Sequence, residues 1–243
     1  MKFLSIVAAC LLVNTGIVNA QQADEDKKAA LGNHADSVAY AFGASVARDL
    51  KRTGLEGINA KVLAQAVADI FDGKASPFDE EQERQLIMTT ITAAREKMDS
   101  RMIEEANAFM DRNGSRPGIV TTASGLQYEV VREGAGERPA LEDTVTVHYK
   151  GQLTDGKVFD SSYDRGEPTT FPLGRVIQGW QEGLRLMPAG AHYRIYVPYR
   201  LGYGERGAGQ DIPPYSPLIF DVELISVQKA AKEPVAVSTE EAE

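Results

Sequence analysis

The residues most able to form a functional site are aromatic and acidic side chains in the second half of the chain. They lie between positions 147 and 220 and are Tyr149, Phe159, Asp160, Val176, Ile177, Trp180, Tyr203, Ile212 and Phe220. The set contains no nucleophile, no serine has the pattern of a hydrolase elbow, and no glycine-rich phosphate loop follows a predicted strand. His34, His148 and His192 lack metal-ligand spacing. The pattern therefore predicts an aromatic pocket whose chemistry is bond rotation rather than bond cleavage.

Each of these residues, taken alone, also fits an ordinary structural role. The aromatic side chains could all be core residues of a small half-barrel, and Phe171 in particular could be mostly core. Asp160 alone could be a turn or ion-pair residue. Its position in the sequence Phe-Asp-Ser-Ser favours a functional role.

The segment that carries the pocket residues has the period of half-buried antiparallel strands. Apolar and polar side chains alternate at 126–130, 145–149, 193–197 and 218–224. Asp155-Gly156 is typical of a hairpin turn. The only helical spacing lies at 177–187, where Trp180 and Leu184 share one face. A short helix laid across a curved antiparallel sheet predicts an α+β domain.

Residues 36–113 have helical spacing and almost no strand pattern. We expect a first helix at about 36–51 and a second from the cap Asn59 to just before Gly73. A third helix at 77–113 would be about 50 Å long at 1.5 Å per residue, with a thin apolar stripe. Three helices with so little core favour pairing with a second copy of the chain. The alternative is a linker helix without a partner.

The two ends of the chain have the composition of processed or disordered segments. Residues 1–20 have the pattern of a secretory signal peptide. Cys10, the only cysteine, follows a Val-Ala-Ala sequence that resembles a lipoprotein box, so acylation there is the alternative. Residues 229–243 predict a disordered acidic tail. We expect export to a periplasm, without a transmembrane segment.

The formal net charge of −9 disfavours binding to nucleic acid or anionic lipid. The acidic residues are spread over several segments, and no basic patch accompanies them. The sequence thus directs attention to the aromatic pocket and to the helices that precede it.

Several short segments in fixed order together resemble an FKBP-type peptidyl-prolyl cis-trans isomerase domain. Each segment is weak alone, but their joint order is specific. They lie at 147–151, 155–162, 176–180, 202–204, 212–214 and 218–224. The leader, the short helices and the long helix further resemble exported Mip-like and FkpA-like members. The implied organisation is a signal peptide (1–20), a helical dimerisation domain (21–76), a long connecting helix (77–113), a linker (114–120), the isomerase domain (121–228) and the tail (229–243).

The resemblance implies a catalytic set of Asp160, Tyr203, Ile177 and Trp180. Trp180 would form the floor of the pocket, and the N–H of Ile177 and the hydroxyl of Tyr203 would donate to peptide carbonyls. Asp160 would lie at the rim near Tyr149 and Arg165. The implied substrate-binding residues are Tyr149, Phe159, Arg165, Phe171, Val176, Ile212 and Phe220. No cofactor or metal is implied.

Two positions depart from the family pattern. Thr169 stands where many relatives have phenylalanine, and the region of Ala208-Gly209 lacks a histidine found in some. Both are expected at the edge of the pocket, so they predict altered ligand preference rather than lost activity.

The implied reaction is rotation about X-Pro bonds of exported polypeptides. The barrier of an amide is about 18–20 kcal/mol because resonance gives the C–N bond double-bond character. A water-poor aromatic cavity would penalise the charge-separated planar amide more than the twisted state. The implied partners are proline-containing exported polypeptides, a second copy of the chain that adds chaperone activity, and macrolide inhibitors of the FK506 and rapamycin type. The alternative function is a non-catalytic holdase chaperone or adhesion module.

Overall fold

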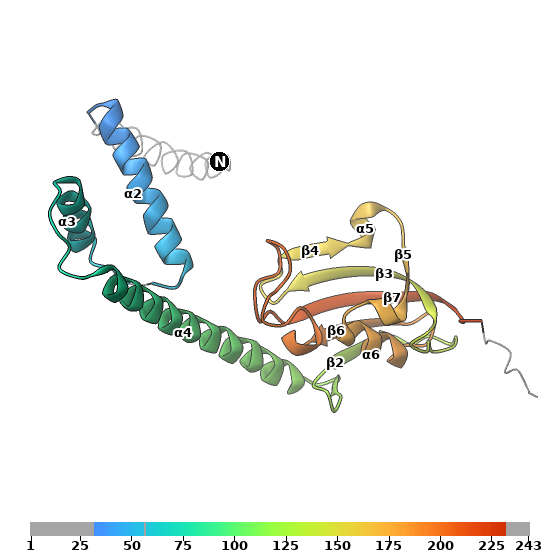
Figure 1. Ribbon diagram of the computed structural model, residues 1–243. Helices are drawn as coiled ribbons and strands as arrows, with labels where there is room; N and C mark the ends of the chain where they lie inside the picture. Colours follow the sequence, from blue (N-terminus) through green and yellow to red (C-terminus); the bar gives the residue numbers. More distant parts are fainter. Residues whose placement is uncertain (1–31, 56, 232–243) are drawn as a thin grey trace, which may run out of the picture. The chain divides into compact units, whose positions relative to one another are not determined.

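A computed structural model describes residues 32–55 and 57–231 of the chain (Figure 1). The expected signal peptide, Cys10 and most of the expected acidic tail lie outside these residues. The chain divides into two compact units, one ending at Glu96 and the other beginning at Lys97. Among the described helices, none is long and apolar enough to cross a membrane.

The first unit is helical, as predicted. It contains α2 (His34–Arg52), α3 (Ala60–Phe71) and the first part of α4 (Glu80–Gly114). The cap predicted at Asn59 is confirmed, and α2 starts two residues before the expected position 36, after the cap Asn33. The side chain of Asn33 accepts a hydrogen bond from Asp36 N at the start of α2, and Asn59 accepts from the first turn of α3. These caps satisfy backbone donors that would otherwise lack a partner.

Helix α4 begins with a reciprocal cap. The carboxylate of Asp79 accepts from Gln82 N at 2.8 Å, and the Gln82 side chain accepts from Asp79 N at 3.1 Å. The helix then continues for 35 residues. Its length follows from the cap at one end and the absence of glycine and proline before Gly114.

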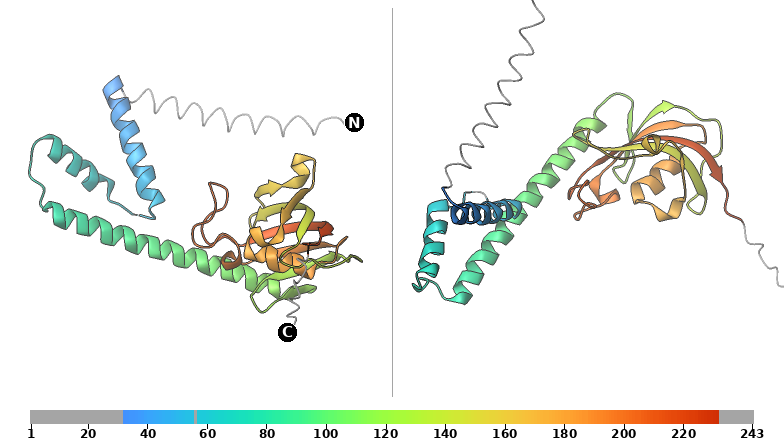
Figure 2. Two further views of the ribbon diagram at one scale, coloured as in Figure 1. Left: turned by 45° about the vertical axis from the view of Figure 1, so that its right-hand side comes forward. Right: turned by 90° about the horizontal axis from the view of Figure 1, so that it is seen from above.

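The second unit is an antiparallel sheet in the order β1-β2-β6-β7-β3-β4, with β5 also paired to β3. The strands are β1 (Ile119–Thr121), β2 (Gln127–Arg132), β3 (Thr144–Leu153), β4 (Val158–Ser161), β5 (Thr169–Pro172), β6 (His192–Val197) and β7 (Leu218–Gln228). The sheet curves over the helix α6 (Gln178–Leu186), as Figure 2 shows. The predicted α+β architecture is confirmed.

Helix α6 packs directly on strand β6 at two positions that have no side chain, Gly179 and Gly183. A Cβ on Gly179 would lie 2.4 Å from Val197 Cγ1, and one on Gly183 would lie 2.8 Å from Ile195 Cδ1. Trp180 and Leu184 on the same face are buried in the core. The two glycines therefore set the distance between helix and sheet.

The last turns of α4 belong to the second unit. Met110 is buried with Tyr196 of β6 and Ile219 of β7. The Asn113 side chain donates to Gln127 Oε1 at 2.8 Å, and Gln127 Nε2 donates to Met110 O at 2.9 Å. The end of α4 is thus held against the sheet by both apolar packing and hydrogen bonds.

Some short elements were not predicted. They are β1, β5, the helix α5 (Ser162–Arg165) and the 3-10 turns η1 (Leu173–Arg175) and η2 (Tyr199–Leu201). Each spans three or four residues, too few for a hydrophobic period to show.

The start of the expected acidic tail is ordered. Asp143, almost fully buried, accepts hydrogen bonds from Ala230 N at 2.9 Å and from Lys229 Nζ at 3.0 Å. The hydrogen bond from Ala140 N, followed by these two, lowers the pKa of Asp143 despite its burial. This contact could not be predicted from local sequence patterns because Asp143 and Lys229 are far apart along the chain.

Candidate functional site

A cavity of about 340 Å³ opens between the sheet and α6. It is lined by Tyr149, Phe159, Asp160, Thr169, Phe171, Arg175, Val176, Ile177, Trp180, Tyr203 and Phe220. Nine of these are residues for which the sequence predicted a site role, and the fold collects them from β3, β4, β5, α6, β7 and the loops between them. The cavity is therefore built by the whole second unit rather than by one motif.

The floor of the cavity is Trp180, which is only 5% exposed. The rings of Tyr149 and Phe220 meet it edge to face, with centroids 5.0 Å and 5.1 Å from its own. Phe171 is tilted against it at 5.4 Å. Edge-to-face contacts of this kind are the favoured geometry for aromatic pairs. They hold the indole face in one orientation, so a flat ring entering the cavity meets a fixed surface.

Gly151 makes room for one wall of the cavity. A Cβ on this residue would lie 2.7 Å from the ring of Phe159 and 2.9 Å from the ring of Phe220. Those two rings pack edge to face at 5.7 Å. Gly151 on β3 is thus required for the position of both aromatic side chains.

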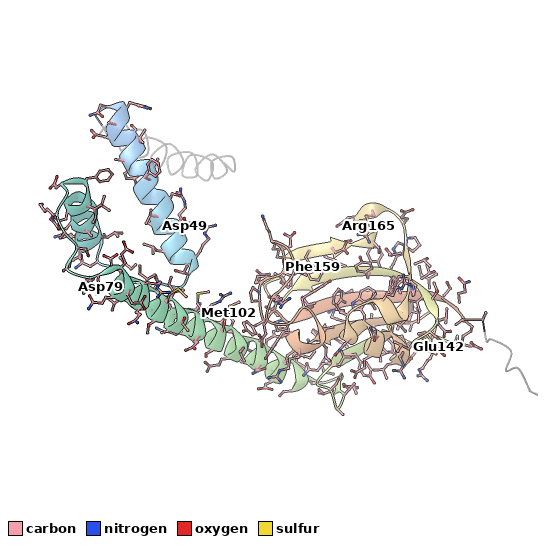
Figure 3. The ribbon with its side chains drawn as sticks, viewed as in Figure 1. Asp49, Asp79, Met102, Glu142, Phe159 and Arg165 are labelled. Carbon is pink, nitrogen blue, oxygen red and sulfur yellow. The ribbon has the colours of Figure 1, made fainter. Side chains whose placement is uncertain are left out.

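The rim of the cavity holds a three-residue polar cluster. Asp160 accepts hydrogen bonds from the hydroxyl of Tyr149 through one carboxylate oxygen and from the guanidinium of Arg165 through the other. Arg165 also donates to the hydroxyl of Tyr149 at 3.0 Å and to Thr169 Oγ1 at 3.1 Å. Phe159 and Arg165 are labelled in Figure 3, on β4 and α5 respectively. The cluster fixes the carboxylate at the edge of an otherwise aromatic cavity.

These contacts keep Asp160 ionised. Burial by itself would raise the pKa of Asp160, but the hydrogen bonds from Tyr149 and Arg165 outweigh it and lower the pKa below its ordinary value. Burial and the hydrogen bond to Asp160 raise the pKa of Tyr149. At neutral pH the pair is therefore a carboxylate and a neutral phenol, and neither is suited to move a proton.

The two serines that follow Asp160 hold this rim in place. Ser161 Oγ accepts from Asp164 N and caps helix α5, which carries Arg165. Ser162, fully buried, accepts from Tyr149 N at 2.8 Å. The Phe-Asp-Ser-Ser sequence thus positions Asp160, and the serines have a structural role.

The buried indole N–H of Trp180, on the cavity floor, has no acceptor within the described part of the chain, and two further donors of the lining also have none. One is the backbone N–H of Ile177, at the start of α6, where the helix dipole favours binding of a carbonyl oxygen. The other is the hydroxyl of Tyr203, which is 41% exposed. Burial and the nearby charge of Asp160 raise the pKa of Tyr203, so its proton is retained. Both donors are available to a ligand.

Two predicted residues, Ile212 and Arg165, are not part of the cavity lining. Ile212 is buried in the core, where it forms a two-way backbone bridge with Ala208. Arg165 reaches the cavity only through Asp160, Tyr149 and Thr169. Conversely, Arg175 lines the cavity and was missed, although it directly precedes the predicted pair Val176 and Ile177. Its exposed side chain belongs to a 3-10 turn that the sequence pattern does not show.

None of the three histidines is part of the cavity lining. His148 stacks on Tyr163 at 4.7 Å, on the opposite side of β3 from Tyr149. Within residues 32–55 and 57–231, no group of three or more His, Cys, Asp or Glu side chains could hold a metal ion.

Comparison with known sequences decides the family. Residues 135–225 match the family described as FKBP-type peptidyl-prolyl cis-trans isomerase, and residues 35–130 match the domain amino terminal to it. The FKBP-type 22 kDa peptidyl-prolyl cis-trans isomerase of Escherichia coli is 42% identical over 191 residues, covering 77% of this chain and 93% of that protein. This chain is a member of the FKBP family.

Other members of the family are similar over most of their length. The peptidyl-prolyl cis-trans isomerase Mip of Coxiella burnetii is 40% identical over 201 residues, covering 80% of this chain and 87% of its own. The crystal structure of FkpA from Escherichia coli matches with a TM-score of 0.63 at 35% identity, over 82% of this chain and 99% of that one. The recognition made from the spaced segments is confirmed, and so is the assignment as an FKBP-type peptidyl-prolyl cis-trans isomerase.

Proposed function

We propose that this FKBP isomerase accelerates rotation about X-Pro bonds of exported polypeptides by removing water from the bond and positioning the peptide. The observation that carries the proposal is the cavity itself. It has an aromatic floor, two donors free to bind carbonyls and a single fixed carboxylate, with no group placed for nucleophilic or proton-transfer chemistry.

The proline ring would lie on Trp180, between the rings of Tyr149 and Phe220. The planar amide carries more separated charge than the twisted amide, so apolar walls raise the energy of the ground state more than that of the transition state. The uncatalysed rotation takes tens to hundreds of seconds. Lowering the barrier by about 7 kcal/mol would accelerate it roughly 10⁵-fold.

The donors on either side would hold the bent peptide. The N–H of Ile177 is fixed because Gln181 Nε2 donates to the carbonyl of the preceding Val176 at 2.7 Å. The hydroxyl of Tyr203 would bind a second carbonyl. Holding both ends of the rotating segment restricts the conformations of the bound peptide, so part of the entropy cost of reaching the transition state is met by binding.

The test is an exchange measurement on a proline peptide by NMR, or a protease-coupled assay. The Tyr203→Phe variant removes one donor and should lower kcat/KM several-fold. Folded wild-type protein that gives the rate of the buffer alone would reject the proposal.

The first unit supports pairing with a second copy of the chain. Helices α2 and α3 contain no buried residue, and their large apolar side chains are exposed. Phe42 is 71% exposed and Phe71 is 89% exposed. Apolar surface of this kind on a soluble protein marks an interaction site. Light scattering on the mature protein should give twice the monomer mass, and Phe42→Ser with Phe71→Ser should reduce it towards the monomer.

A holdase chaperone or adhesion module remains the competing function, because the same apolar helices could bind unfolded chains. Full-length variants separate the two activities. Asp160→Leu should reduce isomerisation and keep suppression of aggregation, whereas the Phe42→Ser, Phe71→Ser pair should do the reverse. Joint loss of both activities in either folded variant would contradict this division.

The proposed setting is the periplasm, on the basis of residues 1–20. N-terminal sequencing of the exported protein should place the cut after Ala20. Retention in a membrane fraction that is lost in a Cys10→Ser variant would instead indicate a lipid anchor.

Macrolide inhibitors of the FK506 and rapamycin type should bind the same cavity. Trp180 is the only tryptophan of the chain, so its fluorescence reports on the floor directly. Thr169→Phe, which restores the ring found in many relatives, should tighten this binding. No change in fluorescence with either macrolide would reject the site.

A further inference from the structure

Tyr215 has a backbone conformation that tyrosine rarely adopts. Among the described residues it is the only one other than glycine with a positive φ, at 57°. The left-handed region is unfavourable for a residue with a Cβ because that atom crowds the following carbonyl. Such strain persists only where the surroundings fix it, and it concentrates at functional sites. The contacts of Tyr215 therefore indicate what it is held for.

The ring of Tyr215 is fixed by helix α4. It packs edge to face on Tyr199, with ring centroids 5.5 Å apart, and both rings are buried against Ala106 of α4. Met102, labelled in Figure 3, and Ile103 complete the contact. We call these five residues the α4 cluster. Although α4 contributes no residue to the cavity, it forms one side of this cluster.

The two tyrosines of the α4 cluster also bind both backbone groups of one residue, Gly204. Tyr215 N donates to the carbonyl of Gly204 at 2.9 Å, and Gly204 N donates to the carbonyl of Tyr199 at 2.9 Å. Gly204 directly follows Tyr203, whose side chain lines the cavity. Both backbone groups of the residue next to Tyr203 are thus bound to the α4 cluster.

We propose that Tyr215 is a positioning residue for the isomerase reaction. By packing on Tyr199 and α4 it fixes Gly204, and Gly204 in turn holds the hydroxyl of Tyr203 at the cavity. Residues of α4 that never touch the peptide then contribute to turnover. The proposal rests on the donor role given to Tyr203 above.

The first test separates the ring of Tyr215 from its backbone conformation. Tyr215→Asn removes the ring but keeps a residue that tolerates positive φ, so the fold should survive. Tyr215→Phe keeps the ring and is the matched control. We expect Tyr215→Asn to lower kcat/KM by up to about tenfold, the worth of one hydrogen bond, and Tyr215→Phe to retain it. Equal kcat/KM in wild type and folded Tyr215→Asn would overturn the proposal.

The second test asks whether the effect passes through Tyr203. In a Tyr203→Phe background, Tyr215→Asn should cause almost no further loss, because the group it positions is absent. The same loss in both backgrounds would show that Tyr215 acts by another route, and the proposal would fail. Loss in Tyr215→Asn but none in Tyr203→Phe would refute the donor role of Tyr203, and the positioning proposal that rests on it would fail too. If Tyr203→Phe has no effect, the proposal that the cavity catalyses isomerisation still stands. That proposal is tested separately, by comparing the wild-type rate with the rate in buffer alone.

The third test approaches from α4. Ala106→Glu places a carboxylate under the two rings, and Asn107→Glu places the same group at the adjacent exposed position. Hydrogen exchange should quicken at the amides of Gly204 and Tyr215 in Ala106→Glu only, with kcat/KM falling in parallel. Unchanged exchange at Gly204 in folded Ala106→Glu would contradict the link between α4 and the loop.

Discussion

The two compact units differ in where they keep their apolar side chains. The second unit buries a continuous core of leucine, valine, isoleucine and aromatic residues between sheet and helix. Helices α2 and α3 of the first unit bury no residue in the single chain. The hydrophobic effect therefore stabilises the second unit through its own core, whereas α2 and α3 leave their apolar side chains on the surface. The aromatic cavity thus lies in the unit that has its own core, and the exposed apolar side chains lie on helices α2 and α3.

The largest expected difference between the units is in stability. Leu184→Ala should lower the free energy of unfolding of the second unit by about 2–5 kcal/mol, because a fully buried side chain leaves a cavity. Leu63→Ala on the exposed face of α3 is the matched change and should alter it by less than about 0.5 kcal/mol. Urea unfolding followed by Trp180 fluorescence measures both. Equal losses would mean that the two units share one core.

The next effect concerns ion-paired carboxylates. Asp160→Leu removes the acceptor of Tyr149 and Arg165 and should lower kcat/KM about tenfold to a hundredfold, since hydrogen bonds to charged groups are worth about 1.5–3 kcal/mol. Asp69, paired with Lys74 at 2.8 Å in the first unit, provides the control. Asp69→Leu should leave peptide isomerisation unchanged. If Asp160→Leu keeps full activity, the cluster of Asp160, Tyr149 and Arg165 has no role in catalysis.

A smaller effect is expected for substrate preference. The cavity lining contains Arg175 and a single carboxylate, that of Asp160, which is already paired with Arg165. Peptides with Glu before proline should react better than those with Lys, and Arg175→Gln should reduce this preference about twofold to fivefold, as for an exposed charge pair. The difference should shrink as salt rises. If the preference for Glu over Lys is unchanged in Arg175→Gln, a residue other than Arg175 is responsible for it.

The smallest expected effect is that of pH on activity. The pKa of Asp160 is lowered and those of Tyr149 and Tyr203 are raised, so none of the three changes charge near neutrality. kcat/KM should be flat between about pH 6 and pH 8. Because the folded pKa of Asp160 is the lower one, its contribution to stability is complete above the unfolded value of about 3.9 and is lost as pH falls through the folded value. A bell-shaped profile near pH 7 would indicate proton transfer.

The sequence predicted those features that depend on local pattern. The long helix was predicted at 77–113 from its helical spacing, and the structure has it as α4, from Glu80 to Gly114. The residues of the cavity floor, such as Trp180 and Phe220, were identified from spaced segments that resemble a known family. The edge-to-face geometry of these rings could not be predicted from the sequence, because the rings come from elements that are distant along the chain.

The features that were missed depend on tertiary contacts. Arg175 reaches the cavity through a three-residue turn, and Ile212 turns inward because a bridge to Ala208 closes its loop. The positive φ of Tyr215 could not be predicted, because this conformation is usually recognised in a sequence by a glycine. In each case the deciding partner lies elsewhere in the fold, where sequence periodicity carries no information.

Gly179 and Gly183 have a consequence for how the enzyme selects its ligands. They determine how closely α6 approaches β6, and the indole of Trp180 is attached to that same helix. These two glycines, which do not line the cavity, therefore set the distance between the cavity floor and the sheet. A single methyl group added at residue 179 would displace Trp180 and the cavity floor. Residues outside the cavity lining therefore determine the size of ring that the cavity can accept.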